Sequence, residues 1–370
     1  MMITILLFLY PLGHLLRLEL FPAVAIYPHD VLLALITMLA IINRPKAKFT
    51  RPLIIFSFIA LTSLIIGSTQ VSFLQALTGS LYLIRWFSVV GLYFFATNIP
   101  KKSAYELLLL AGSSLTVLGL IQYGLFPDLR ELRLLGWDDH YYRLTSTLFD
   151  PGFTGIIIVL TILLLLKSRQ LFSRNTYYII LATNFIALLL TYSRASYLAF
   201  IAGIIVLGWQ KSKKLIIGIV ILLAASLLFL PRPGGAGVQL TRMFSLQKRV
   251  QTWQEAVTIF RDRPAFGVGF NLLRYSKYNY KFIDNKWQTS HSAAGVENSF
   301  LFLLSTTGIV GFTAFMYLLF SIAKSNHFLA ANIIAISTHA IFTNTWFYPW
   351  VMIWFWILAA TARKSPSSLE

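Results

Sequence analysis

Residues 297–323 have the sequence ENSFLFLLSTTGIVGFTAFMYLLFSIA, an apolar run in which Glu297 is the only charged residue. About 20 apolar residues in a helix cross the hydrocarbon core of a bilayer, which is roughly 30 Å thick. Inside that core every backbone polar group needs a partner within the protein, and a helix satisfies them all internally. The run is continuous rather than alternating, unlike a strand of a membrane barrel. It therefore predicts a transmembrane helix.

Eleven further apolar runs repeat this pattern. The chain is 57% hydrophobic and only 12% charged, with a mean hydropathy of +0.71, which is far from the composition of soluble proteins. We therefore predict an all-α integral membrane protein with about twelve transmembrane helices. Aromatic residues within 346–356 are expected to form an anchoring belt at the outer end of the last helix. The expected helix cores are 2–19, 29–43, 52–67, 78–98, 105–126, 151–166, 176–191, 195–209, 215–230, 297–323, 328–343 and 347–362.

Positive charge alternates between successive short connections. Lys and Arg lie in every second one, from the connection after residue 43 to the tail after residue 362. Because short cytoplasmic loops retain an excess of these residues, both termini are predicted to be cytoplasmic, in a multi-pass protein of the cytoplasmic (inner) membrane. The first run has no basic region before it, so we expect a retained span rather than a signal peptide. Pro11, His14 and Arg17 interrupt this span, and the loss of one span would reverse part of the map.

One long polar segment divides the membrane helices into two groups. Residues 231–296 carry ten Lys and Arg against three Asp and Glu, and the charge map places them outside. We therefore predict nine membrane helices in residues 1–230, an extracytoplasmic basic loop at 231–296, and three membrane helices with a short cytoplasmic tail in 297–370. The orientation rule acts on short loops and leaves a long loop free to carry charge for another purpose. The positive charge indicates an anionic ligand, and we expect no nucleic-acid partner.

Within this loop, residues 248–260 (KRVQTWQEAVTIF) have the period of an amphipathic helix. Such a helix is expected to lie in the membrane interface with its apolar face in the headgroup boundary. Arg249 then falls at the edge of the apolar stripe, at the depth of a lipid phosphate. The apolar residues are spaced three, four and three apart, at Val250, Trp253, Val257 and Phe260.

The segment after this helix, RDRPAFGVGF (261–270), predicts a helix stop followed by a tight backbone turn. Pro264, Gly267 and Gly269 punctuate it. A single Gly-x-Gly motif without further glycines is weak evidence for phosphate binding. Because the segment follows no predicted strand, a dinucleotide site is not supported.

Several short motifs recur in a fixed order between residues 140 and 320. Together they resemble the signature region of the O-antigen ligase and polymerase superfamily. The first five helices match that family only in general character. The motifs are Arg143-Leu144-Thr145 leading to Phe149-Asp150-Pro151, Tyr192-Ser193-Arg194-Ala195, Arg249-x-x-x-Trp253-x-x-Ala256, Pro264-x-x-Gly267-x-Gly269, Glu297-Asn298-Ser299-Phe300-Leu301, and Gly308-x-x-Gly311.

The resemblance implies a glycosyltransferase-C-like membrane enzyme of the cell envelope. It implies transfer of a glycan from a polyprenyl (undecaprenyl) diphosphate carrier to an acceptor hydroxyl at the outer face of the cytoplasmic membrane, without a nucleotide sugar, metal or other cofactor. The partners are then the carrier-linked donor, a lipid or glycan acceptor, and the bilayer. A lipopolysaccharide ligase and a surface polysaccharide polymerase differ in the acceptor, and both remain open.

Arginines are the residues expected to hold the donor. A guanidinium suits a diphosphate because it donates two parallel hydrogen bonds. Arg194 and Arg249 are predicted to clamp the diphosphate and to offset the charge that develops as the glycosidic bond breaks, with Arg143 and Arg274 assisting. Arg85 lies inside the 78–98 run, where a charge is costly and usually faces a partner or a wet cavity. Arg194 and Arg249 also have simpler interpretations, as a snorkelling residue and as the edge of an amphipathic helix.

The acceptor hydroxyl requires a base. In the family's ligases a histidine commonly precedes the asparagine, whereas here Glu297 precedes Asn298. Either the Glu297 carboxylate replaces the imidazole, or this member activates its acceptor differently, with His291 as the alternative base. Asn298 joins the expected substrate-binding residues. A helix-start acid favoured by the helix dipole is an equally good interpretation of Glu297.

A transporter, including a flippase of lipid-linked oligosaccharide, is the alternative function. Twelve helices with both termini inside is also a carrier arrangement. Against it, the two halves of the chain show no repeat, and the long connection follows the ninth helix on the outside. A flippase would also need arginines for the diphosphate, but in the middle of many spans rather than at outer helix ends.

Overall fold

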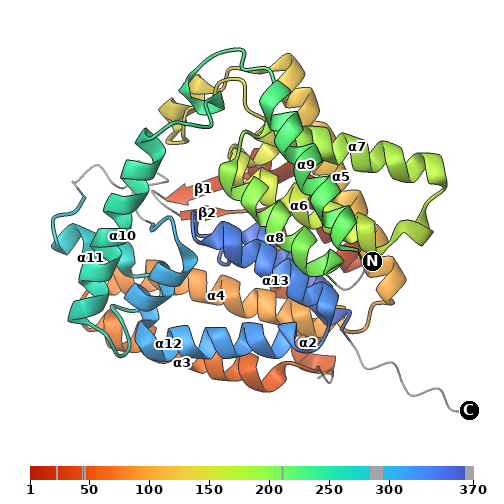
Figure 1. The fold of residues 1–370 in the computed structure, drawn as a ribbon. Helices are drawn as coiled ribbons and strands as arrows, with labels where there is room; N and C mark the ends of the chain where they lie inside the picture. Colours follow the sequence, from red (N-terminus) through yellow and green to blue (C-terminus); the bar gives the residue numbers. More distant parts are fainter. Residues whose placement is uncertain (22–23, 44, 46, 210–211, 284–294, 363–370) are drawn as a thin grey trace, which may run out of the picture.

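The computed structural model describes residues 1–370 except 22–23, 44, 46, 210–211, 284–294 and 363–370 (Figure 1). His291, the alternative base, lies outside the described residues. The chain is mostly helical, which confirms the predicted fold class in its coarse form. A small antiparallel hairpin interrupts the helices, in which β1 (Leu18–Phe21) pairs with β2 (Val24–Ile26).

Each predicted apolar run contains a helix, and except in the first run, where α1 ends at Leu9, its bounds lie within a few residues of those expected. Four helices in the described part of the chain are long and apolar enough to cross a membrane, namely α3, α4, α5 and α12. The count of twelve spans therefore stays a prediction. The helices of the predicted runs are α1 (Met2–Leu9), α2 (Pro28–Asn43), α3 (Thr50–Ser68), α4 (Phe73–Ala96), α5 (Lys101–Leu125), α6 (Pro151–Lys167), α7 (Arg174–Leu190), α8 (Arg194–Gly208), α9 (Lys213–Phe229), α12 (Ser299–Ala323), α13 (His327–Ala340) and α14 (Pro349–Ala360).

The first run does not continue as one helix. After α1 the chain forms a 3-10 turn, Tyr10–Leu16, in which Gly13 has a left-handed φ of 55°. Pro11 lacks an N–H donor, and proline is compatible with the start of such a turn but not with a helix interior. The chain then enters the β hairpin. This break brings His14 to a cavity wall instead of burying it in a span.

In its described part, the polar segment adds two α-helices, α10 (Phe244–Asp262) and α11 (Leu273–Asn279). Figure 1 shows α3, α4 and α12 side by side, with α10 crossing their ends. The amphipathic helix predicted at 248–260 is therefore present, and it crosses the bundle helices instead of running along them. Its buried face is formed by Glu255, Ala256 and Ile259, while Val250 is 40% exposed.

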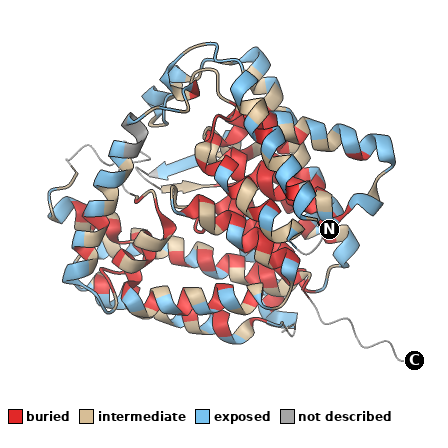
Figure 2. Cartoon of the chain, in the orientation of Figure 1, coloured by how far each residue is buried: buried red, intermediate tan, exposed pale blue. Residues whose placement is uncertain are grey.

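Burial separates a central group of helices from an outer group (Figure 2). Almost every residue of α6 and α14 is buried, as expected for helices that are apolar on all sides. On α3, by contrast, Ile54, Phe58 and Ile65 are 59–67% exposed and lie on one face. Such an apolar outer face is suited to lipid contact.

The aromatic residues of α14 do not form an interfacial belt, so that prediction is wrong. Trp350, Trp354 and Trp356 are at most 2% exposed. They pack inside the bundle, where Trp356 meets Trp86 and Tyr93 with ring centroids 5.8 and 5.7 Å apart. The burial reflects the central position of α14, which the run of aromatic residues alone does not specify.

A break in α12 is filled by the segment that follows α10. Gly308 has a left-handed φ of 66° and interrupts the hydrogen-bond ladder of α12. Residues 264–269 enter this break: Ile309 N donates to the Pro264 carbonyl at 2.8 Å, and Val268 N donates to the Ser305 carbonyl at 3.0 Å. The Ser63 hydroxyl of α3 also donates to the Thr306 carbonyl at 2.7 Å. The predicted tight turn thus joins α3, α10 and α12.

We expect Gly308→Ala to prevent normal folding. A Cβ at this position would lie 2.1 Å from the Ala265 carbonyl oxygen, at a backbone φ that alanine disfavours. Overpacking typically costs about 1–3 kcal/mol and left-handed strain about 1–3 kcal/mol more. Unfolding followed in detergent should therefore reveal a large loss of stability. Gly124→Ala is the matched control, because nothing lies within 4 Å of its added Cβ; equal stability of the two variants would contradict the interlock.

Candidate functional site

A cavity of about 1630 Å³ brings together residues from both halves of the chain. It is larger than the 300–1,000 Å³ or so of a pocket for one small molecule. Of the eight residues predicted to form the site, six line this cavity. They are Arg85, Arg143, Arg194, Arg249, Arg274 and Glu297.

Glu297 and Arg249 form an ion pair at the cavity wall. Arg249 Nε donates to Glu297 Oε2 at 2.6 Å, and the Trp253 indole of the same helix donates to the Glu297 carbonyl at 3.2 Å. The Glu297 side chain is 43% exposed, and it lines the cavity. Burial raises the pKa of Glu297 above its usual range, and Arg249 opposes this shift. The carboxylate is therefore a stronger base than an ordinary surface glutamate.

A second, fully buried ion pair supports this arrangement. Lys277 of α11 lies 2.9 Å from Glu255 of α10, and the two side chains are 2% and 9% exposed. Lys277 also donates to the Gly295 carbonyl at 3.2 Å. The lysine therefore links α10 and α11 to the backbone two residues before Glu297. Nothing in the amphipathic pattern of 248–260 indicated that Glu255 would be buried.

Two arginines donate hydrogen bonds to backbone carbonyls at the C-terminal end of α7. Arg143 donates to the Thr191 and Tyr192 carbonyls at 3.1 and 3.3 Å, and Arg242 donates to the Tyr192 carbonyl at 3.2 Å. A helix C-terminus presents unpaired carbonyls and partial negative charge, which favours cations. Tyr192 itself has a left-handed φ of 49°, and such strained residues often cluster at functional sites. Arg242 belongs to no motif and was missed by the sequence analysis.

The positive charges of this wall are crowded. Burial lowers the pKa of Arg143, and the charge of Arg242 lowers it further. Burial likewise lowers the pKa of Arg242, with Arg194 and Arg249 adding to the shift. Arg194 begins α8 and donates to the Leu240 carbonyl at 3.0 Å. An anion placed among these guanidinium groups would relieve their mutual repulsion.

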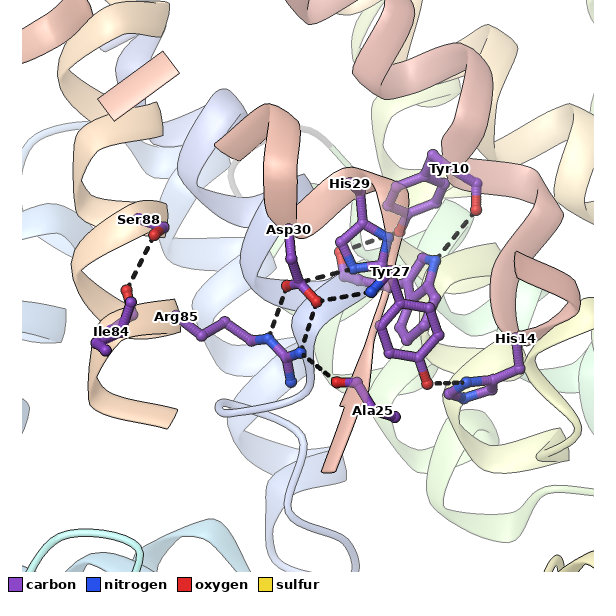
Figure 3. Close-up of polar contacts among 10 residues, drawn as sticks. Tyr10, His14, Ala25, Tyr27, His29, Asp30, Ile84, Arg85 and Ser88 are labelled. Carbon is purple, nitrogen blue, oxygen red and sulfur yellow. Dashed lines mark hydrogen bonds and ion pairs between the residues drawn. The ribbon is translucent and has the colours of Figure 1, made fainter. Parts of the chain in front are cut away.

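Arg85, like Arg249, is paired with a carboxylate. Its Nε and Nη2 donate to the two oxygens of Asp30 at 2.9 and 2.7 Å (Figure 3). Asp30 also accepts from the Tyr27 backbone N–H at 3.1 Å, at the start of α2. The prediction that Arg85 faces a partner or a cavity holds in both respects, since it has the partner and lines the cavity.

His14 lies beside this pair, on the other side of Tyr27 (Figure 3). Its Nδ1 is 2.7 Å from the Tyr27 hydroxyl and its Nε2 is 3.1 Å from the Tyr348 hydroxyl. Both ring nitrogens therefore have partners. The sequence analysis noted His14 only as an interruption of a span.

Asn298 is not part of the cavity lining. Its side-chain oxygen accepts hydrogen bonds from the backbone N–H groups of Phe300 and Leu301 at 2.9 and 3.0 Å. It is therefore the N-cap of α12. The structure thus gives Asn298 a structural role directly after Glu297, and its expected substrate-binding role stays a prediction.

Residues 178–316 match the family model described as O-antigen ligase. Over these residues the chain is similar to the O-antigen ligase family, and we call this segment the O-antigen ligase domain. The family indicated by the motifs is thereby confirmed. The matched segment includes Arg194, Arg249 and Glu297, whereas Arg85 and Arg143 precede it. No curated protein matches the chain.

The O-antigen ligase domain supports a glycan ligase or polymerase activity and a multi-pass membrane setting. The family also implies lipid-linked glycan donors as a class. Four of the six predicted cavity residues lie in this domain, on α8, α10 and α11 and just before α12, while α4 and the loop before α6 supply the other two. The site is therefore shared between the domain and the helices that precede it.

We expect Lys277→Met to destabilise the O-antigen ligase domain strongly. The substitution leaves the Glu255 carboxylate buried without its partner, which typically costs about 3–5 kcal/mol. Replacing both residues, as Glu255→Leu with Lys277→Met, should recover most of that loss because no buried charge remains. Denaturant unfolding of both variants measures the difference. A double variant no more stable than the single one would refute the role of the ion pair.

Proposed function

We propose that the protein transfers a glycan from a polyprenyl diphosphate carrier to an acceptor hydroxyl at the outer face of the cytoplasmic membrane, without a nucleotide sugar or metal. In this proposal residues 231–296 face outward, as the charge map predicts. One observation carries it: four guanidinium groups from different parts of the fold converge on one cavity beside a carboxylate. They belong to Arg143, Arg194, Arg242 and Arg249, and the carboxylate is that of Glu297.

The arginines are proposed to hold the donor diphosphate. They present only hydrogen-bond donors, and guanidinium groups match phosphate oxygens in pairs. Arg249 uses its Nε for Glu297, which leaves its terminal nitrogens to face a phosphate. As the bond from the anomeric carbon to the diphosphate oxygen breaks, negative charge grows on the leaving group, and preorganised guanidinium groups stabilise it.

Glu297 is proposed to act as the base. The acceptor oxygen attacks the anomeric carbon, the carbon–oxygen bond to the diphosphate breaks with its electron pair, and the hydroxyl proton passes to the Glu297 carboxylate. A base is most effective when its pKa approaches the working pH. Burial shifts the pKa of Glu297 in that direction. Arg249 then serves both groups, because it orients the base and neutralises the leaving group.

The proposal is tested with purified protein in liposomes and a polyprenyl-diphosphate oligosaccharide, with product followed by mass. Arg249→Lys and Glu297→Gln should each lower kcat by roughly 100-fold or more, as expected when a transition-state contact or base is lost. Arg261→Lys is the matched control, since Arg261 lies on the same helix but outside the cavity.

The same assay separates the candidate activities. Longer carrier-linked glycans from the donor alone identify a polymerase, and product that requires an added lipid acceptor identifies a ligase. Movement of intact donor between leaflets without a new bond would replace the enzyme with a flippase. Full activity of Arg249→Lys would count against a bidentate clamp.

The rate should also depend on pH through Glu297. As the pH falls through the raised pKa of this carboxyl, protonation removes the base and weakens the ion pair with Arg249, so kcat/KM should decrease. The midpoint of this acid limb should lie above the usual range of a glutamate, because burial raises the pKa. In Glu297→Gln the residual rate should lack that limb. A limb that persists unchanged in the variant would assign it to another group.

A further inference from the structure

The cavity has a second wall with the opposite hydrogen-bonding character. His140 is only 8% exposed, and its Nε2 has no hydrogen-bond partner among the described residues. The same is true of Asn344 Oδ1. Both residues line the cavity, as do the carboxylates of Asp138 and Asp139. An amide oxygen and a carboxylate only accept hydrogen bonds.

His140 is also an acceptor. Burial lowers its pKa to about 3, and the charges of Arg143 and Arg242 lower it further, while a hydrogen bond with the Phe149 backbone opposes the shift. The ring is therefore neutral at ordinary pH. Donation from one nitrogen to a backbone carbonyl leaves the other nitrogen with a free lone pair. A buried acceptor without a partner is energetically unfavourable, so Nε2 is suited to a ligand that donates.

Aromatic rings lie beside these acceptors. Trp137 is partly buried, and its ring centroid is 4.4 Å from that of His14 and 5.6 Å from that of Phe149. The Arg17 guanidinium also lies over this ring, 5.5 Å from its centroid. Tyr348 continues the aromatic surface along the cavity. The face of an aromatic ring carries negative potential, which attracts the weakly positive hydrogens of C–H groups.

The unpartnered acceptors and the carboxylates suit a sugar better than a phosphate. A diphosphate only accepts hydrogen bonds, so acceptors and carboxylates would repel it. A sugar ring offers hydroxyl donors at its edge and an apolar C–H face. The arginine wall and this aromatic and acceptor wall therefore suit the two chemically different parts of the proposed reaction.

We propose that Trp137, His140 and Asn344 form a subsite for a sugar of the acceptor glycan. Trp137 packs against the ring face, and a sugar hydroxyl donates to His140 Nε2. The assignment to the acceptor rests on the proposed function. The charges of Arg143 and Arg242 act on His140, so the proposed subsite lies close to the arginines that are proposed to hold the donor. A cavity of about 1630 Å³ has room for both substrates.

The test measures binding separately from transfer. The probes are a carrier-free oligosaccharide, released by mild acid from the cell's own surface glycan, and inorganic diphosphate. Trp137→Ala in the full-length protein should weaken oligosaccharide binding by about tenfold or more, equivalent to about 1.4 kcal/mol, and leave diphosphate binding within about twofold, since the arginines are intact. Trp137→Phe should retain most of the affinity. Trp209→Ala, at an exposed tryptophan outside the cavity, is the matched control.

The outcomes distinguish the subsite from the proposed function. Oligosaccharide binding that depends on Trp137 in a protein without transferase activity would support the subsite and refute the function. Wild-type transfer with oligosaccharide binding that is absent, or unchanged in Trp137→Ala, would refute the subsite alone.

In the transfer assay the oligosaccharide should compete with the acceptor. Competition with the donor only would overturn the assignment of the subsite to the acceptor. The unfolding midpoints of the variants should match that of the wild type. Loss of diphosphate binding in Trp137→Ala would show that the substitution disturbs the whole cavity, and it would overturn the specific role of Trp137 in sugar binding.

Discussion

The site depends on the insertion of residues 264–269 into the broken helix α12. A break at Gly308 frees backbone groups that a bilayer would not solvate, and the inserted segment provides their partners. The same contact holds the C-terminal end of α10 close to α12, and a hydrogen bond from α3 joins α3 to this region. Arg249 and Glu297 therefore meet because backbone hydrogen bonds, rather than flexible side chains, set the positions of their helices. Rigid support of this kind is what a site for charge stabilisation needs.

Around this support, the cavity concentrates positive charge without a matching number of carboxylates. Asp30 neutralises Arg85 and Glu297 pairs with Arg249, but Arg143 and Arg242 are held mainly by carbonyls at the end of α7. Carbonyl dipoles hold a guanidinium in place without cancelling its charge. The arrangement keeps a strong positive potential inside a poorly solvated cavity, which attracts an anion more effectively than exposed charges do.

Much of the helical architecture and several site residues were predictable from local pattern. The helices of the apolar runs and the amphipathic helix were predictable because helix formation depends mainly on residues that are close in the sequence. The arginines were identified from the short motifs that contain them. Other features were not predictable. Glu255 and Lys277 are separated by the inserted segment, Arg242 belongs to no motif, and the unpartnered Nε2 of His140 is defined only by what surrounds it. The glycines at 267 and 269 resembled a turn, but their close fit against α12 depends on contacts with a distant helix.

By itself, the sequence determined that the chain is helical and that it is suited to a membrane, because these properties follow from composition and period. Its motifs between residues 140 and 320 also resembled those of the O-antigen ligase and polymerase superfamily. Only the tertiary structure decided which charges meet. It paired Arg85 with Asp30 and Arg249 with Glu297, assigned Asn298 to a helix cap, and buried the aromatic residues of α14. The physical reason is that burial and pairing are properties of three-dimensional surroundings, and in this chain the surroundings of each site residue come from helices far apart in the sequence.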